Sequence, residues 1–191
     1  MVNKSTSVNK TALNQERGEV DNIRPILSTG VGINESIIQN ISIAKQEPKW
    51  MLALRLKAYK IYLEKPLPHF GPDLSQIDLD HIKYFQRATN YVARKWEDVP
   101  YTIKETFERI GVPEAERKYL AGSAAQYESE AVYSKRKKDL EAKGIIFMDT
   151  DSALREHPGL VRQYFGTLVE ASDNKFSALN PAVWSGGTFL Y

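Results

Sequence analysis

Residues 49–64 constrain the fold more than any other stretch, because their apolar residues cover an unusually wide face of one helix. One stripe contains Leu52, Leu56 and Tyr59, and a second stripe beside it begins with Trp50. Prolines flank the stretch on both sides and limit the helix to it. A face this wide typically contacts two neighbouring elements. The stretch therefore predicts a helix inside a multi-helix body.

Further helices follow from their end signals. Asn34 is a good N-cap for an isoleucine-rich helix that we expect to run until Pro48, and Asp98 caps a helix that ends at Gly111. We also expect helices at 114–120 and 135–143, an extended segment at 127–133 and a short buried strand at 145–148. A last helix is capped by Asp149 or Thr150, is interrupted at Pro158 and continues to Phe165.

These patterns predict an α+β fold that is mostly α. Residues 1–30 are polar and we expect them to form a flexible segment, since they offer little apolar surface to offset their ordering entropy. Residues 31–182 form the mostly helical region. Residues 183–191 end in the β-prone sequence Thr188–Tyr191 and predict a strand.

Composition excludes several classes of function. The chain of 191 residues has no cysteine, which rules out thiolate-bound zinc, Cys-ligated iron–sulfur clusters and a cysteine nucleophile within it. The 26 basic and 24 acidic residues leave a net charge of +2, without the basic surplus of a nucleic-acid binder. We find no apolar run of membrane-spanning length and no secretory signal, so we expect a cytoplasmic protein without a membrane partner.

The residues that could carry chemistry favour structural roles. Asp149, Thr150 and Asp151, followed by Glu156 and His157, have the side chains of a hard-metal or acid–base site, but helix capping explains them better. The three histidines of the chain lack ligand spacing. We therefore expect neither catalytic nor metal-ligating residues and no enzyme. A hydrolase built on Asp149, Asp151 and His157 is the weakest alternative.

Three other motifs are weak signals. The basic run 135–138 could touch phosphates, but the acidic residues after it favour a solvated helix. Gly30 and Gly32 precede a helix without the strand and third glycine of a dinucleotide site. The pair Gly186 and Gly187 lies in an apolar stretch and predicts a bend or bulge.

Blocks of sequence from about residue 32 to residue 191 resemble the SufB family of iron–sulfur cluster assembly scaffolds. Their shared order and spacing carry the resemblance. The blocks are Glu47–Leu52, Arg55–Ala58, Gly71–Leu74, Trp96–Pro100, Thr106–Gly111, Pro113–Gly122, Ala125–Glu130, Asp149–Glu156, Asp173–Phe176, Ala178–Asn180 and Ala182–Phe189.

The resemblance implies an architecture and a position in it. SufB-like proteins have a helical N-terminal region followed by a right-handed parallel β-helix. Residues 31–182 are similar to the N-terminal region, and the block around Trp184 and Ser185 resembles the entrance to the β-helix. On this resemblance, residues 183–191 would be the start of a truncated β-helix core, and the chain would be an N-terminal fragment of the scaffold.

The resemblance also implies partners and cofactors for the whole family complex. The full-length scaffold works with a SufD-like paralogue, a SufC-like ATPase and a sulfur-donor protein. An iron–sulfur cluster is assembled there, and reduced flavin is linked to the complex. The cluster ligands and the sulfur-accepting residue belong to family regions beyond this sequence, so we expect no cofactor in this segment.

Two functions follow from these expectations. The first is a structural and docking part of the scaffold, with the sequence Gln126, Tyr127, Glu128, Ser129 and Glu130 as the candidate docking surface, because it places two carboxylates, a phenol and an amide close together. A solvated connector explains these five residues too. The second function is a stand-alone helical adaptor between proteins.

Overall fold

A computed structural model gives the structure of this chain. It describes residues 24–93, 95–109, 111, 122–127, 129–136, 140 and 142–191; within 122–127 and 132–136 it describes the backbone alone.

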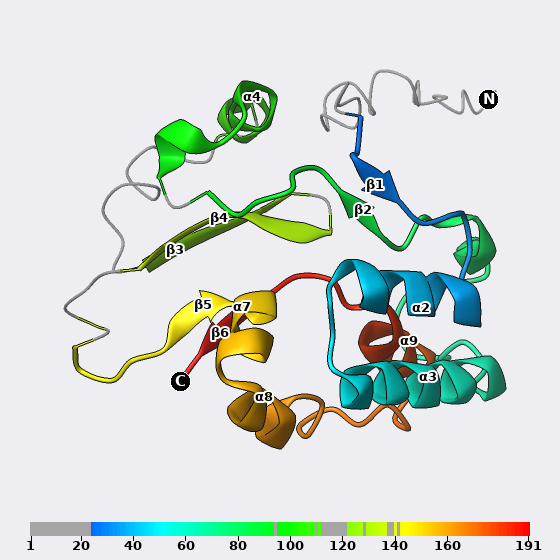
Figure 1. Cartoon of the computed structure of the whole chain (residues 1–191). Coiled ribbons are helices and arrows are strands. Elements are labelled where there is room, and N and C mark those ends of the chain that lie inside the picture. The colour runs from blue at the N-terminus through cyan, green and yellow to red at the C-terminus, as the bar shows by residue number, and fades with distance from the viewer. Residues whose placement is uncertain are drawn as a thin grey trace, which may run out of the picture.

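Three helices form the helical body at one end of the molecule (Figure 1): α2 (Glu35–Ala44), α3 (Lys49–Glu64) and α9 (Lys175–Val183). The predicted N-cap of α2 is confirmed, because Asn34 Oδ1 accepts a hydrogen bond of 2.9 Å from the backbone N–H of Ile37. The predicted helix 49–64 is confirmed at both ends. The helix α9, which packs along α3, was not predicted.

The wide apolar face of α3 packs against two separate cores, as the two stripes predict. Its C-terminal half, with Ala58 and Tyr62, packs with α2 and α9. Its N-terminal half, with Met51, packs with residues of α7, α8 and the segment at Trp184. Complete burial of a side chain such as Met51 stabilises the fold by about 1.5–3 kcal/mol. The helix therefore joins the two halves of the molecule.

The strands form three two-stranded antiparallel sheets. They are β1 (Leu27–Ser28) with β2 (Gln86–Arg87), β3 (Gly122–Tyr127) with β4 (Glu130–Arg136), and β5 (Phe147–Asp149) with β6 (Thr188–Leu190). The β3–β4 hairpin contains a register shift between Ala125 and Gln126. It lies beside β5, and its turn contacts Gln86 of β2 through Ser129 (Figure 1).

Short helices complete the structure. α7 (Thr150–Glu156) and α8 (Pro158–Tyr164) follow β5, and Pro158 opens α8 at its first turn, as predicted. The 3₁₀ turns Leu79–His81 and Trp96–Asp98 precede β2 and α4 (Tyr101–Arg109), respectively. α4 packs through Ile103 against Val99. Gly111 has φ 78°, as expected for the residue that ends this helix.

Two predictions of local structure differ from the structure. α2 ends at Ala44 rather than Pro48, because Gln46 adopts a left-handed conformation with φ 54°. The predicted helix 135–143 is wrong at its start, since Lys135 and Arg136 pair with β3 in the hairpin. Pairing with the preceding strand of the same hairpin outweighs the helical charge pattern there. The predicted helix 114–120 lies outside the described residues.

The described part of the chain has a short strand near each end. Most of the predicted flexible segment 1–30 lies outside the described residues. Residues 26–29, however, run beside β2, with Ile26 donating to Arg87 O and Thr29 donating to Phe85 O. At the other end, the predicted terminal strand is β6, and it pairs antiparallel with β5. The parallel β-helix remains a prediction, because every pair among the described strands is antiparallel.

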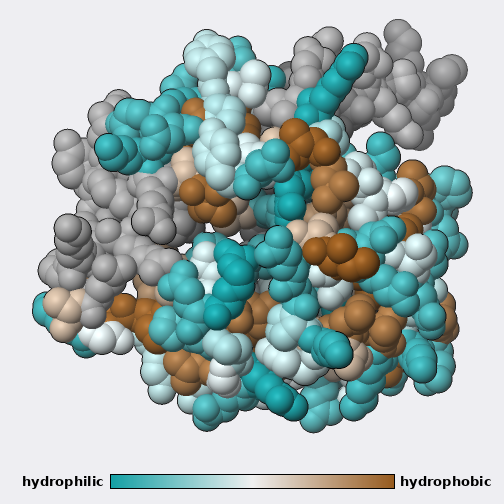
Figure 2. Space-filling model, viewed as in Figure 1, coloured by the Kyte–Doolittle hydropathy of each residue, from teal (hydrophilic) through white to brown (hydrophobic). Residues whose placement is uncertain are grey.

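Apolar and hydrophilic side chains both contribute to the surface. Figure 2 shows apolar patches separated by hydrophilic side chains on the face in view. Within the described ranges, each helix is too short or too polar to cross a membrane.

Candidate functional site

Asp149 and Asp151, at the start of α7, have different roles. Asp149 Oδ1 accepts a hydrogen bond of 2.9 Å from the N–H of Ser152, so Asp149 caps α7 as predicted. Asp151 instead contacts Lys45 of α2. His157 ends α7, and His81 pairs with Asp78 on the surface. Among the residues that the structure describes, no group of three His, Asp or Glu side chains could hold a metal ion.

The structure brings six charged side chains from five segments together, and two of them lie next to Trp184. We call this group the charge cluster, and it consists of Lys45, Glu47, Arg55, Arg87, Glu130 and Asp151. Its members lie between the helical body, the β3–β4 hairpin and the β5–β6 sheet.

Lys45 at the C-terminal end of α2 is the centre of one half of the cluster. Its ammonium is completely buried and donates to Asp151 Oδ2 at 2.7 Å and to the carbonyl of Ser185 at 2.5 Å. Glu130 Oε1 lies 3.6 Å away, which is an ion pair beyond hydrogen-bonding distance. Buried ammonium groups are stable only when they are paired in this way.

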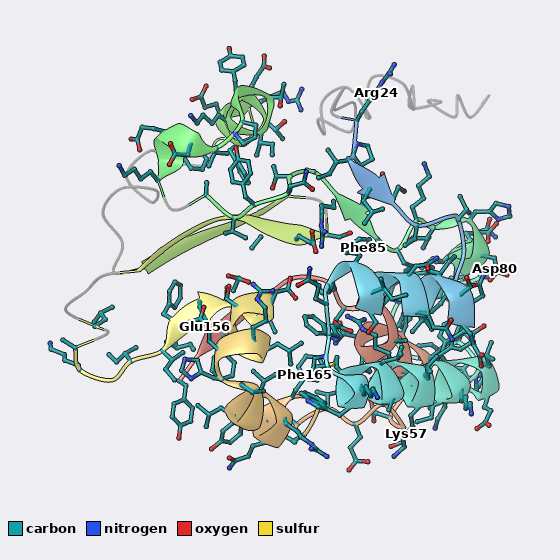
Figure 3. All side chains as sticks on the ribbon, in the orientation of Figure 1. Arg24, Lys57, Asp80, Phe85, Glu156 and Phe165 are labelled. Atoms are coloured by element: carbon teal, nitrogen blue, oxygen red, sulfur yellow. The ribbon has the colours of Figure 1, made fainter. Side chains whose placement is uncertain are left out.

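Arg87 extends this half of the cluster toward the hairpin. It forms a two-pronged pair with Glu130, in which Nε contacts Oε2 and Nη2 donates to Oε1 at 2.8 Å. Nη2 also donates to the carbonyl of Ala44 at 3.0 Å, next to Lys45 in the chain. The hydrogen bonds that Arg87 donates to Glu130 raise the pKa of Arg87, so this cation keeps its charge. The aromatic ring of Phe85 lies between β2 and α2 (Figure 3), near both cations.

Arg55 on α3 is the centre of the other half. It is fully buried and forms a bidentate pair with Glu47, with distances of 2.7 Å from Nε and 2.6 Å from Nη2. Its guanidinium also donates to the carbonyls of Ala182 and Trp184, at 3.1 Å and 2.8 Å. The planar guanidinium suits this arrangement, because it can bind a carboxylate and two carbonyls at once.

The indole of Trp184 lies next to both buried cations. Lys45 Nζ is 5.0 Å from the centroid of the ring and Arg55 Cζ is 4.8 Å from it, and both distances are typical of cation–π contacts. Lys45 and Arg55 together bind three carbonyls between residues 182 and 185. The cluster therefore fixes the course of the backbone from α9 into β6.

Gly187 belongs to the same segment. Its carbonyl accepts a hydrogen bond of 3.1 Å from the N–H of Thr150, and its φ is 155°. A Cβ atom at this position would lie 2.8 Å from Thr150 Oγ1. The predicted bend at Gly186 and Gly187 thus corresponds to a close contact that requires glycine.

Burial also changes the acid–base properties of the cluster. It raises the pKa of the Asp151 carboxyl, while the positive charge of Lys45 opposes that rise. Among the residues that the structure describes, one carboxylate oxygen of Asp151, Oδ1, is buried without a hydrogen-bond partner, and so is Trp184 Nε1.

The residues of the candidate docking surface lie at the turn of the hairpin. Gln126 and Tyr127 belong to β3, Ser129 lies in the turn, Glu130 starts β4, and Glu128 lies outside the described residues. The Ser129 hydroxyl accepts a hydrogen bond of 2.8 Å from the N–H of Gln86. Glu130 is largely buried and bound to Arg87 and Lys45, so its carboxylate is engaged within the chain.

Sequence reasoning missed the charge cluster as a site. One signal could have revealed half of it: Arg55 stands on the apolar face of α3, four residues after Met51 and three before Ala58. A charged residue in that position implies a buried partner. The arrangement can hold backbone in place.

Comparison with known proteins identifies relatives of the chain. No family model matches it. A Staphylococcus epidermidis protein named Iron-sulfur cluster assembly SufBD family protein is 56% identical over 160 residues, which cover 84% of this chain and 34% of the relative. A Mycobacterium tuberculosis protein of the same family name is 55% identical over 161 residues, 84% of this chain and 19% of the relative. A Staphylococcus saprophyticus relative is 53% identical over 178 residues, 93% of this chain and 38% of the relative.

The matched segments therefore include most of this chain, whereas the chain spans about a third of the length of the staphylococcal relatives and about a fifth of the mycobacterial one. On this similarity, the chain belongs to the SufBD family of iron–sulfur cluster assembly proteins.

Proposed function

We propose that this chain serves in iron–sulfur cluster assembly as a structural and docking part of a SufB-type scaffold and contributes no thiolate chemistry. The observation that carries the proposal is the identity of 53–56% with proteins named for cluster assembly. The absence of cysteine in the sequence supports a role other than ligation of the cluster or acceptance of sulfur. In this role the chain is not an enzyme.

The charge cluster supports the structural part of the proposal. Buried ion pairs rarely add net stability compared with apolar residues, but they demand one particular geometry. Here the pairs hold the carbonyls of Trp184 and Ser185. We infer that the cluster fixes the direction in which β6 leaves the helical body.

The docking part is assigned to residues 126–130. A hairpin turn that is held against a fixed body is a suitable contact for a partner protein, since loops carry recognition more often than cores do. The proposed partner at this turn is the sulfur donor. The SufD-like paralogue and the SufC-like ATPase are the proposed partners of the whole family protein, the iron–sulfur cluster is its cargo, and the cytoplasm is its proposed location. Reduced flavin is assigned to no residue here.

Substitution of the docking residues tests this role. In the protein that carries this chain, Glu128→Ala together with Glu130→Ala should lower sulfur transfer and cluster yield while the helical body stays folded. Glu105→Ala, a change at an exposed carboxylate on α4, is the matched control and should have no effect. Undiminished sulfur transfer in the double variant would remove the docking role.

Partner capture tests the family role as a whole. Affinity capture of the native protein from its own cells, followed by mass spectrometry, should recover other cluster assembly proteins. If the captured material contained none of them under gentle extraction, the proposed place in cluster assembly would lose its support.

A further inference from the structure

Four members of the charge cluster form a line of alternating charges. From the N-terminal end of α7 to β2, the order is Asp151, Lys45, Glu130 and Arg87, with contacts of 2.7 Å and 3.6 Å for the first two pairs and a two-pronged pair for the third. The line crosses from the β5–β6 side of the molecule to the β3–β4 hairpin. Glu130 is its only member on the hairpin.

The described contacts between the hairpin turn and its neighbours are polar. Glu130 binds Arg87 and Lys45, while Ser129 exchanges hydrogen bonds of 3.1 Å and 2.8 Å with the backbone of Gln86. Polar contacts depend on charge and geometry, so one local change can weaken them without disturbing an apolar core.

We propose that this line of charges is a latch, which holds the β3–β4 hairpin on the helical body and releases it when Glu130 leaves its two cations. The biological purpose of the latch rests on the proposed function, because Glu130 belongs to the proposed docking surface. A sulfur donor with a basic side chain at its interface would compete with Lys45 and Arg87 for this carboxylate and would open the latch as it binds.

Asp151 and Glu130 compete for Lys45. Two of the three ammonium N–H groups donate to Asp151 Oδ2 and the Ser185 carbonyl, which leaves Glu130 at a longer distance. Glu130 and Asp149 are the other carboxylates that act on Asp151, and the charge of Asp151 also acts directly on Arg87. A proton on the unpartnered Oδ1 of Asp151 would break no existing hydrogen bond. Neutral Asp151 would leave Lys45 to Glu130 and tighten the latch.

Hydrogen exchange of the backbone amides in the full chain tests the latch. Glu130→Gln keeps the shape of the side chain and removes its charge. Because hydrogen bonds to charged groups are stronger than neutral ones by about 1 kcal/mol, exchange in the hairpin should become roughly five- to tenfold faster. The amides of α3 should exchange as before, and the exposed control Glu64→Gln should change neither region.

Unchanged exchange in the hairpin of Glu130→Gln would overturn the latch. An equal acceleration in the hairpin and in α3 would overturn it too, since Glu130 would then only support global stability. Asp151→Asn tests the competition: the hairpin amides should exchange more slowly than in the natural chain, and unchanged or faster exchange contradicts the competition between the two carboxylates.

Hydrogen exchange is measured on the chain without a partner, so a negative result there is distinguishable from a negative result in the sulfur-transfer assay. If Glu130→Gln accelerates exchange in the hairpin but Glu128→Ala/Glu130→Ala transfers sulfur at the natural rate, the docking role alone is refuted. If Glu130→Gln leaves exchange in the hairpin unchanged but Glu128→Ala/Glu130→Ala lowers sulfur transfer, the latch alone is refuted.

Discussion

Lys45 Nζ lies 2.7 Å from Asp151 Oδ2, although 106 positions separate these residues in the chain. The same buried ammonium donates to the carbonyl of Ser185, 140 positions away. One side chain thus connects the end of α2, the start of α7 and the segment that leads into β6. Together with Arg55, it makes the arrangement of these segments depend on buried charge, and the predictions below test that dependence.

The pair of Arg55 and Glu47 should show strong energetic coupling. Both side chains are fully buried, so Arg55→Met leaves an unpaired buried carboxylate and should lower the free energy of unfolding by about 3–5 kcal/mol. The double variant Arg55→Met/Glu47→Leu removes both charges and should lose less than the sum of the two single changes. Urea denaturation of the four proteins measures the coupling.

A control on the same helix separates charge from helix propensity. Lys57 is exposed, and its side chain points away from the body (Figure 3). Lys57→Met should change the free energy of unfolding by less than about 0.5 kcal/mol. Additive losses in the Arg55 and Glu47 variants would show that their ion pair contributes no coupling.

Asp151 should make stability depend on pH with an unusual sign. Its pKa is raised in the folded chain, so the folded state binds a proton more tightly than the unfolded state. The free energy of unfolding should therefore fall as the pH rises from the ordinary aspartate pKa through the raised folded value. Asp151→Asn lacks this ionisation. As the pH rises through this range, the free energy of unfolding of the natural chain should therefore fall relative to that of the variant.

Urea denaturation at a series of pH values provides the measurement. Asp98→Asn, a change at an exposed carboxylate, should leave the pH profile as it is in the natural chain. A profile in which the natural chain gains stability relative to Asp151→Asn as the pH rises would mean that Lys45 outweighs the burial of Asp151.

Gly187 should not tolerate a side chain. Gly187→Ala adds a Cβ atom 2.8 Å from Thr150 Oγ1 at a φ of 155°, and it should lower the free energy of unfolding by about 1–3 kcal/mol. Gly159→Ala is the matched control, because open space surrounds that position within α8. The control should be neutral or slightly stabilising, since alanine favours helix. Equal thermal stability of the two variants would contradict the close contact at Gly187.

The free edge of β6 should promote self-association of the 191-residue chain. Tyr191 and Ile146 exchange both backbone hydrogen bonds, so in an antiparallel ladder the N–H and C=O of Leu190 point away from β5. The side chain of Leu190 is 67% exposed. Exposed edges of this kind pair with other chains. Sedimentation velocity at increasing concentration should detect oligomers, and Leu190→Lys should reduce them.

Ile43→Lys serves as the control for this change, because Ile43 is similarly exposed but lies on the helix α2 rather than on a strand. A natural chain that stays monomeric at all concentrations and unfolds cooperatively would favour the stand-alone adaptor over the scaffold role.

Local signals predicted the elements whose ends are coded in their own sequence. The helix 49–64 lies between prolines, Asn34 and Asp149 cap their helices, and Pro158 opens α8. In each case one residue supplies or removes a specific backbone hydrogen bond. Such signals are short in range and can be recognised without knowledge of the fold.

Long-range contacts decided what the sequence could not reveal. α9 contains Pro181, which argues against a helix, yet the small residues Ala178 and Ala182 let it pack closely on α3. Lys135 and Arg136 became strand residues through pairing with β3. Lys45 and Asp151 of the charge cluster are 106 positions apart, so no local pattern predicts their pairing, whereas the position of Arg55 on α3 signals the other half of the cluster.

The most direct test of the central claim is the activity of iron–sulfur enzymes in the source cells after depletion of the gene that encodes this chain. The predicted result is a loss of activity in several such enzymes, with recovery when the intact gene is restored and no change in enzymes that lack a cluster. Full activity of the iron–sulfur enzymes after depletion would contradict a role in cluster assembly.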